Sequence, residues 1–151
     1  MSQRASDSGK TPVVGHHDRR VAELKTLGAL LGCHEDIGNQ LPDGRRPDVV
    51  RLSHSKRLLF IGDAKDTESP GSRASQARLE AYLSWMRANV ASGARGLMVI
   101  CYGRRTDTEG WLSTLTTLAD ECGIEVQDAG TETFGPGLWI TWLYMGGQPH
   151  L

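Results

Sequence analysis

The chain has 151 residues, the length of one ordinary domain, which is long enough to bury a core and too short for two catalytic domains. Hydrophobic residues make up 38% and charged residues 23%, a composition that excludes a collagen-like chain and one that is disordered throughout. With a formal net charge of −1, any nucleic-acid partner has to be held by local basic patches rather than by the charge of the whole molecule.

The apolar stretches and the first residues indicate where the protein resides. The longest apolar runs, 97–102 and 138–145, are far shorter than the roughly 20 residues that cross a bilayer, so we expect no membrane partner. The first residues lack the apolar core of a secretory signal, which predicts a cytoplasmic protein. Residues 1–16 are polar and aperiodic, so we expect a flexible N-terminal arm followed by a single domain over 17–151.

The domain is expected to open with a helix and a short strand. Asp18 is a suitable N-cap, and Gly32 stands where the helix should stop. The inward face is predicted from apolar residues at helical spacing: Val21, Leu24, Leu27 and Leu31. A strand within 33–40 and a turn-rich loop over 41–47 follow.

Two short strands, 48–52 and 58–65, are joined by few residues, which predicts an antiparallel hairpin. A turn centred on Ser55-Lys56, or a loop of the four residues 54–57, pairs position 48 with position 63 in either case. The second strand is apolar enough to lie in the centre of a sheet.

The second half alternates helices and strands. After the breaker run 69–72, a long helix that ends near Gly93 is predicted from Leu79, Tyr82, Leu83, Met86 and Val90. A buried strand is expected at 96–102. The run 106–109 matches a capping box and opens a helix that Gly123 closes. The inward residues of that helix are expected to be Trp111, Leu115, Leu118 and Cys122.

Strands at 124–127 and 138–145 complete the order α-β-β-β-α-β-α-β-β, which predicts an α/β fold with a central mixed sheet flanked by helices. Trp139 and Trp142 point to opposite faces of the last strand. Core packing and a homodimer that covers one of them are the two interpretations. The three cysteines have no ligand spacing and are expected to be small buried hydrophobes.

Chemistry is concentrated in the hairpin. The predicted pairing sets Asp48 opposite Asp63, and opposed β-carbons lie about 5 Å apart, so the two carboxylates repel unless a proton or cation lies between them. Mg²⁺ prefers oxygen ligands and often uses one or two carboxylates together with a phosphate. Strand alternation puts Lys65 on the same face as Asp63, where an ammonium can stabilise charge on a phosphate. This combination is typical of phosphodiester hydrolysis.

The run Pro47-Asp48, an apolar strand and then Gly62-Asp63-Ala64-Lys65 resembles the motif of the PD-(D/E)XK nuclease superfamily, and residues 18–103 resemble its restriction-endonuclease-like αβββαβ core. The resemblance implies a Mg²⁺-dependent DNA endonuclease in which Mn²⁺ substitutes. It implies Asp48 and Asp63 as metal ligands, the Ala64 carbonyl as a further ligand, and Lys65 as catalytic.

Members of the superfamily also carry auxiliary residues on their helices. Glu23, at the edge of the apolar arc of the first helix, is the expected auxiliary acid. Gln76 and Tyr82 on the helix after Lys65 match a further pair in some branches, although their separation departs from the usual four residues.

Four arginines near the predicted site are candidates for DNA phosphate contacts: Arg46, Arg51, Arg73 and Arg78. Ordinary surface basicity is the alternative. Asp66 and Glu68 are interpreted as a solvated acidic loop rather than a second metal site, and no histidine is assigned a catalytic role. No glycine loop matches a nucleotide-binding fingerprint, so no nucleotide cofactor is expected.

Three other interpretations stay open. The chain could be a non-catalytic nuclease-fold module that binds DNA or a protein. It could be a structure-selective nuclease, such as a Holliday junction resolvase, or act on RNA. It could also be a generic α/β domain in which Asp48 is a turn cap and Asp63 and Lys65 form a solvated strand end.

Overall fold

The computed structural model describes residues 16–37, 44–65, 68–90 and 93–146. The predicted arm therefore lies outside the described residues, except His16, which already belongs to the first helix. The elements in chain order are α2 (His16–Leu30), β1 (Cys33–Asp36), β2 (Val49–Ser53), β3 (Leu58–Ala64), α3 (Arg73–Asn89), β4 (Arg95–Tyr102), a 3₁₀ turn η1 (Arg105–Asp107), α4 (Thr108–Glu121), β5 (Val126–Gly135) and β6 (Leu138–Gly146). This is the predicted order of helices and strands.

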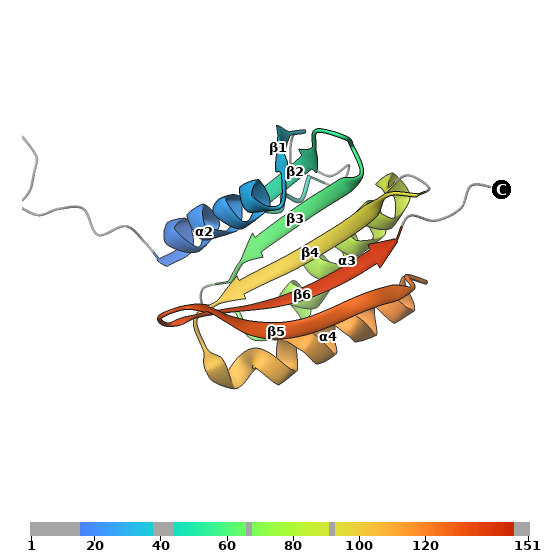
Figure 1. The fold of residues 1–151 in the computed structure, drawn as a ribbon. Helices are drawn as coiled ribbons and strands as arrows, with labels where there is room; N and C mark the ends of the chain where they lie inside the picture. Colours follow the sequence, from blue (N-terminus) through green and yellow to red (C-terminus); the bar gives the residue numbers. More distant parts are fainter. Residues whose placement is uncertain (1–15, 38–43, 66–67, 91–92, 147–151) are drawn as a thin grey trace, which may run out of the picture.

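The six strands form one mixed sheet in the order β1-β2-β3-β4-β6-β5 (Figure 1). Strands β3 and β4 are parallel, and the other neighbours are antiparallel. The helix α3 connects the parallel pair, as such a crossover requires. The predicted α/β class with a central mixed sheet is confirmed.

The helices cover the two faces of the sheet unequally. In Figure 1, α2 lies over β1–β3 on one face, and α3 and α4 lie on the other. Strand alternation sends Phe60 and Val99 into the core under α2, and Ile61 and Met98 into the larger core under α3 and α4. Each core therefore stabilises the position of a helix that borders the end of β3.

The β2–β3 hairpin has the predicted register. Val49 pairs with Gly62 and Leu52 with Leu59, and the loop is the four residues 54–57. The Lys56 N–H donates to the Ser53 carbonyl at 2.8 Å, with Lys56 in the left-handed region at φ 61°. Continued by one residue, this register brings Asp48 to the end of β3 beside Asp63.

Two predictions about helix ends are wrong. The helix α2 begins at His16 rather than Asp18 and ends at Leu30, so Leu31 lies beyond it and is 43% exposed instead of facing inward. The expected capping box over 106–109 does not form. Asp107 takes the N-cap position of α4, and its carboxylate accepts from Arg104 Nε at 3.2 Å instead of capping the helix. Thr106 lies inside the preceding 3₁₀ turn.

The last two strands differ in how well the sequence predicts them. The strand β5 extends to Gly135, far beyond the predicted 124–127, because an edge strand paired only with β6 can be polar along most of its length. The strand β6 lies inside the sheet, between β4 and β5. Trp139 packs towards α4 and Trp142 towards the α2 face, both half-buried, and coverage of either by a second copy stays a prediction.

Cys33 and Cys101 are buried as expected, whereas Cys122 at the end of α4 is only partly buried. In the described ranges, no helix has the length and apolar character needed to cross a membrane.

Candidate active site

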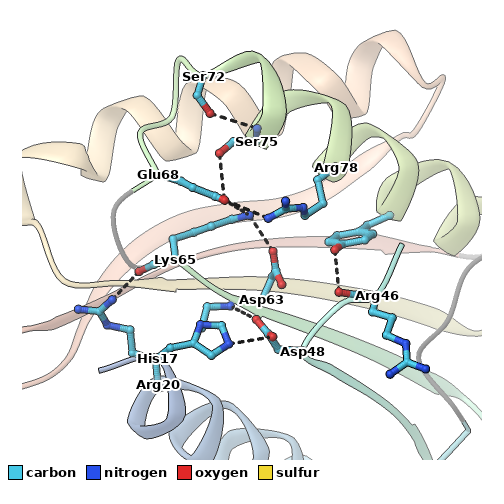
Figure 2. Close-up of polar contacts among 12 residues, drawn as sticks. His17, Arg20, Arg46, Asp48, Asp63, Lys65, Glu68, Ser72, Ser75 and Arg78 are labelled. Carbon is cyan, nitrogen blue, oxygen red and sulfur yellow. Dashed lines mark hydrogen bonds and ion pairs between the residues drawn. The ribbon is translucent and has the colours of Figure 1, made fainter. Parts of the chain in front are cut away.

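The predicted chemical residues come together at the carboxyl end of β3, between α2 and the start of α3 (Figure 2). Asp48 lies just before β2, Asp63 and Ala64 are the last residues of β3, and Lys65 follows directly. Asp63 is 3% exposed and Lys65 is 1% exposed, although both side chains are ionisable. Burial of such groups requires partners, and the structure supplies them.

The Asp48 carboxylate connects two elements. Its Oδ2 accepts a hydrogen bond from the Ala64 N–H at 2.7 Å, which fixes it to the end of β3. Its Oδ1 lies 3.1 Å from Nε2 of His17, a residue of α2. The side chain is 21% exposed, so Asp48 is positioned from both sides and still borders solvent.

Asp63 and Lys65 form a buried ion pair, with 2.8 Å between Asp63 Oδ2 and Lys65 Nζ. Burial raises the pKa of Asp63 from 3.8 to about 7; the Lys65 ammonium opposes this rise, and the neighbouring Asp48 carboxylate adds to it. The two carboxylates therefore lie close enough to disfavour each other's charge, as the hairpin register predicts. A cation between them would relieve that repulsion.

Lys65 is fixed through its backbone as well as its side chain. Its N–H donates to the Cys101 carbonyl of β4 at 2.9 Å, and its own carbonyl accepts from Arg20 Nη1 of α2. Its ammonium lies 5.9 Å from the centre of the Trp111 ring of α4. Contacts with β4, α2 and α4 thus hold Lys65 in position.

A second carboxylate reaches the Lys65 ammonium from the opposite side. Glu68 Oε1 lies 3.4 Å from Lys65 Nζ, and both Glu68 oxygens accept from Arg78 Nη1, at 3.1 and 2.9 Å. The Ser75 hydroxyl contacts Oε1 at 3.4 Å. Figure 2 shows Lys65 Nζ between the Glu68 and Asp63 carboxylates. Glu68 lies on the loop after β3 with 28% of its side chain exposed, so it is partly solvated and also paired with two cations, whereas Asp66 lies outside the described residues.

Of the four candidate arginines, the structure brings Arg78 into the site. Arg46 is exposed, and its side chain extends away from the carboxylates in Figure 2. Arg51 lies half-buried within β2, and Arg73 is exposed at the start of α3. Their contacts with DNA remain predictions.

Glu23, the auxiliary acid expected on the first helix, lies farther along α2 than the residue that contacts Asp48. Glu23 lies along α2, about two turns beyond His17. Burial raises the pKa of Cys101 to about 11, an increase that Arg20 opposes and Glu23 enhances. His17, to which the sequence assigned no role, is the α2 residue that contacts Asp48.

Tyr82 and Gln76 of α3 do not form a common site. The Tyr82 hydroxyl donates to the Arg46 carbonyl at 2.9 Å, which ties α3 to the segment before Asp48. Burial raises the pKa of Tyr82, and the Asp63 carboxylate adds to the rise. Gln76 is exposed in a hollow of about 220 Å³ that it shares with α4 residues such as Ser113.

The site can be tested for its fit to a divalent cation. Among the described residues, no group of three or more His, Cys, Asp or Glu side chains forms a metal cage. A hydrated Mg²⁺ needs fewer protein ligands, because waters and a substrate phosphate complete its shell. Asp63 Oδ2 is buried and accepts no hydrogen bond from the described part of the chain, although it is paired with Lys65. The carboxylates of Asp48 and Asp63 are therefore the oxygen donors that this part of the chain offers a cation, and a magnesium ion between them stays a prediction.

A hollow of the surface lies at the other end of the hairpin, away from the carboxylates. It measures about 350 Å³ and is lined by His34, Glu35, His54 and Lys56. All four residues are exposed. The Asp63–Lys65 pair is instead covered by side chains, Glu68 among them.

Comparison with known proteins leaves the site to be interpreted from its own geometry. No protein-family model, no curated protein and no solved structure matches this chain.

Proposed function

We propose that this protein is a Mg²⁺-dependent endonuclease of restriction-endonuclease-like fold that hydrolyses phosphodiester bonds in DNA. The observation that carries the proposal is the buried Asp63–Lys65 pair, 2.8 Å apart at the end of a central strand with Asp48 beside it. The element order α2-β1-β2-β3-α3-β4 also supports it, because it matches the αβββαβ core that the sequence resembles. In that core the metal ligands and the lysine share one end of the sheet, as Asp48, Asp63 and Lys65 do in this chain.

Asp48 and Asp63 are the residues that would hold the metal, with the Ala64 carbonyl as a further oxygen. A bound Mg²⁺ supplies charge to the phosphate and lowers the pKa of a bound water, and Mn²⁺ would serve in its place. Asp48 is kept in position by the Ala64 N–H and by His17. Lys65 contributes an ammonium of fixed position that stabilises charge developing on the phosphate oxygens.

The test is cleavage of plasmid DNA and of a four-way junction with Mg²⁺, Mn²⁺ or EDTA. Asp63→Ala and Lys65→Ala each should lower metal-dependent cleavage by about a hundredfold or more. Matched controls are Asp128→Ala on β5 and Lys25→Ala on α2, both at exposed positions. Equal cleavage by all five proteins would contradict the proposal.

A non-catalytic module that binds DNA is the second candidate, and one observation favours it. The Lys65 side chain is 1% exposed and Asp63 5%, so the reactive groups are covered in the free protein. Folded protein that binds DNA and Mg²⁺ but cuts neither duplex, single strand, junction nor RNA would support this candidate. Preferential cutting of the junction would instead identify a structure-selective nuclease.

A further inference from the structure

The Glu68 carboxylate is surrounded by groups that bind oxyanions. Its two oxygens accept from Arg78 Nη1 at 3.1 and 2.9 Å, and Oε1 also contacts Lys65 Nζ and the Ser75 hydroxyl, each at 3.4 Å. An arginine, a lysine and a hydroxyl around two oxygens are also the donors that recognise a phosphodiester group.

The two cations among these donors do not depend on Glu68 for compensation of their charge. Lys65 already has a closer carboxylate partner in Asp63, at 2.8 Å compared with 3.4 Å for Glu68. The Arg78 side chain is 41% exposed, so water can solvate its guanidinium when Glu68 is displaced. Glu68 is itself 28% exposed, and ion pairs at such positions contribute little stability. The contact is therefore one that a competing anion can replace.

The contact between Glu68 and Lys65 matters because the Lys65 ammonium is buried in the free protein. Its side chain is 1% exposed, with Asp63 on one side of the ammonium and Glu68 on the other (Figure 2). Asp63 belongs to the central strand β3 and is fixed there. A phosphate oxygen can approach Lys65 from the side on which Glu68 now lies.

We propose that Lys65, Arg78 and Ser75 form a binding subsite for a backbone phosphodiester of DNA, and that Glu68 occupies this subsite in the free protein and is displaced by the phosphate. The inference rests on the proposed function for the identity of the ligand. It gives Glu68 a role opposite to that of Asp48 and Asp63: its carboxylate weakens substrate binding.

The experiment measures binding of a labelled DNA duplex by fluorescence anisotropy in EDTA, where no cleavage occurs. Glu68→Gln is expected to tighten binding about five- to tenfold, because the amide no longer competes as an anion for the two cations. The slope of log K against log salt should steepen by about one, since each phosphate that the protein neutralises releases about one counterion from the DNA. Inorganic phosphate is added as a competitor to separate a general anion site from recognition of the nucleic-acid backbone.

Matched variants show whether the gain arises at this subsite. Glu80→Gln changes the net charge by the same amount at an exposed position of α3 and should leave affinity unchanged. In the double variant Glu68→Gln/Arg78→Gln, the gain should be lost, because one of the two cations is absent. Glu68→Asp, which keeps the charge but shortens the side chain, should give a smaller gain and provides a second variant if Glu68→Gln does not fold.

Three outcomes would overturn the inference: equal gains in Glu68→Gln and Glu80→Gln, a gain that persists without Arg78, or unchanged or weaker binding in both folded Glu68 variants. These outcomes are separate from failure of the proposed function. Tighter binding by Glu68→Gln without any metal-dependent cleavage would support the subsite and contradict the nuclease, whereas cleavage without tighter binding would do the reverse.

Discussion

At the scale of single residues, Asp63 shows how a carboxylate can lower the stability of the fold that contains it. Burial raises its pKa from 3.8 to about 7, and the Lys65 ammonium only partly compensates. The ionised form is therefore less favourable in the folded chain than in the unfolded chain. Below about pH 4 the carboxyl is protonated in both states; the cost grows as pH rises towards 7 and is constant above that value.

Asp63→Asn, a neutral substitute of the same shape, should remove this cost. The difference in free energy of unfolding, variant minus wild type, should increase from about pH 4 to about pH 7, by at most about 4 kcal/mol. Urea unfolding at a series of pH values measures it, with the exposed Asp128→Asn as control. A difference that does not change with pH would show that Asp63 is not held in this environment.

At the scale of elements, the position of α2 relative to the site depends on Arg20. This buried arginine donates to the Lys65 carbonyl, and its guanidinium occupies the space that a side chain at Gly103 would need. The absence of a Cβ at Gly103 therefore lets α2 contact the end of β3. His17, one turn earlier in α2, reaches Asp48 for the same reason.

Gly103→Ala should displace the Arg20 guanidinium and destabilise the protein by about 1 to 3 kcal/mol. Because both changes break the same contact, Arg20→Ala and Arg20→Ala/Gly103→Ala should be about equally stable. Denaturant unfolding measures this, and Gly71→Ala is the control, since its added methyl group meets no atom. Fully additive effects would contradict the coupling.

The hairpin and its two aspartates could be predicted from the sequence because loop length and strand alternation fix a register locally. His17, Arg20 and Glu68 could not be assigned in this way. The role of each depends on a contact with a residue of another element. The apolar periodicity that indicates a helix gives no information about a histidine or arginine in its first turns. Glu23, on the same helix, is a sequence-based choice whose described interaction is electrostatic, with the Cys101 thiol of β4.

At the scale of the whole molecule, the site combines parts of α2, the β2–β3 hairpin, α3 and α4, so a ligand bound there should stabilise the entire fold. At a Mg²⁺ concentration ten times its Kd, the free energy of unfolding should rise by about 1.4 kcal/mol, or about 3 to 5 °C in Tm. The shift should be larger above pH 7 than below, because protons compete for Asp63, whose pKa is about 7.

Differential scanning fluorimetry measures this shift, and Asp63→Asn should abolish it while Asp128→Asn retains it. An equal shift in both variants would place the ion elsewhere on the surface. A homodimer that covers Trp142, one of the two interpretations of that residue, is independent of this test, because the Trp142 side chain lies on the face of the sheet that carries Ile140 and Tyr144.

The parallel pairing of β3 with β4 determines when the candidate site assembles during folding. The Lys65 N–H bonds to the Cys101 carbonyl, so Lys65 takes its place only after the crossover through α3 has closed. Pairings between distant parts of a chain form slowly. A nascent or incompletely folded chain would thus carry all the residues of the site in its sequence without the assembled site.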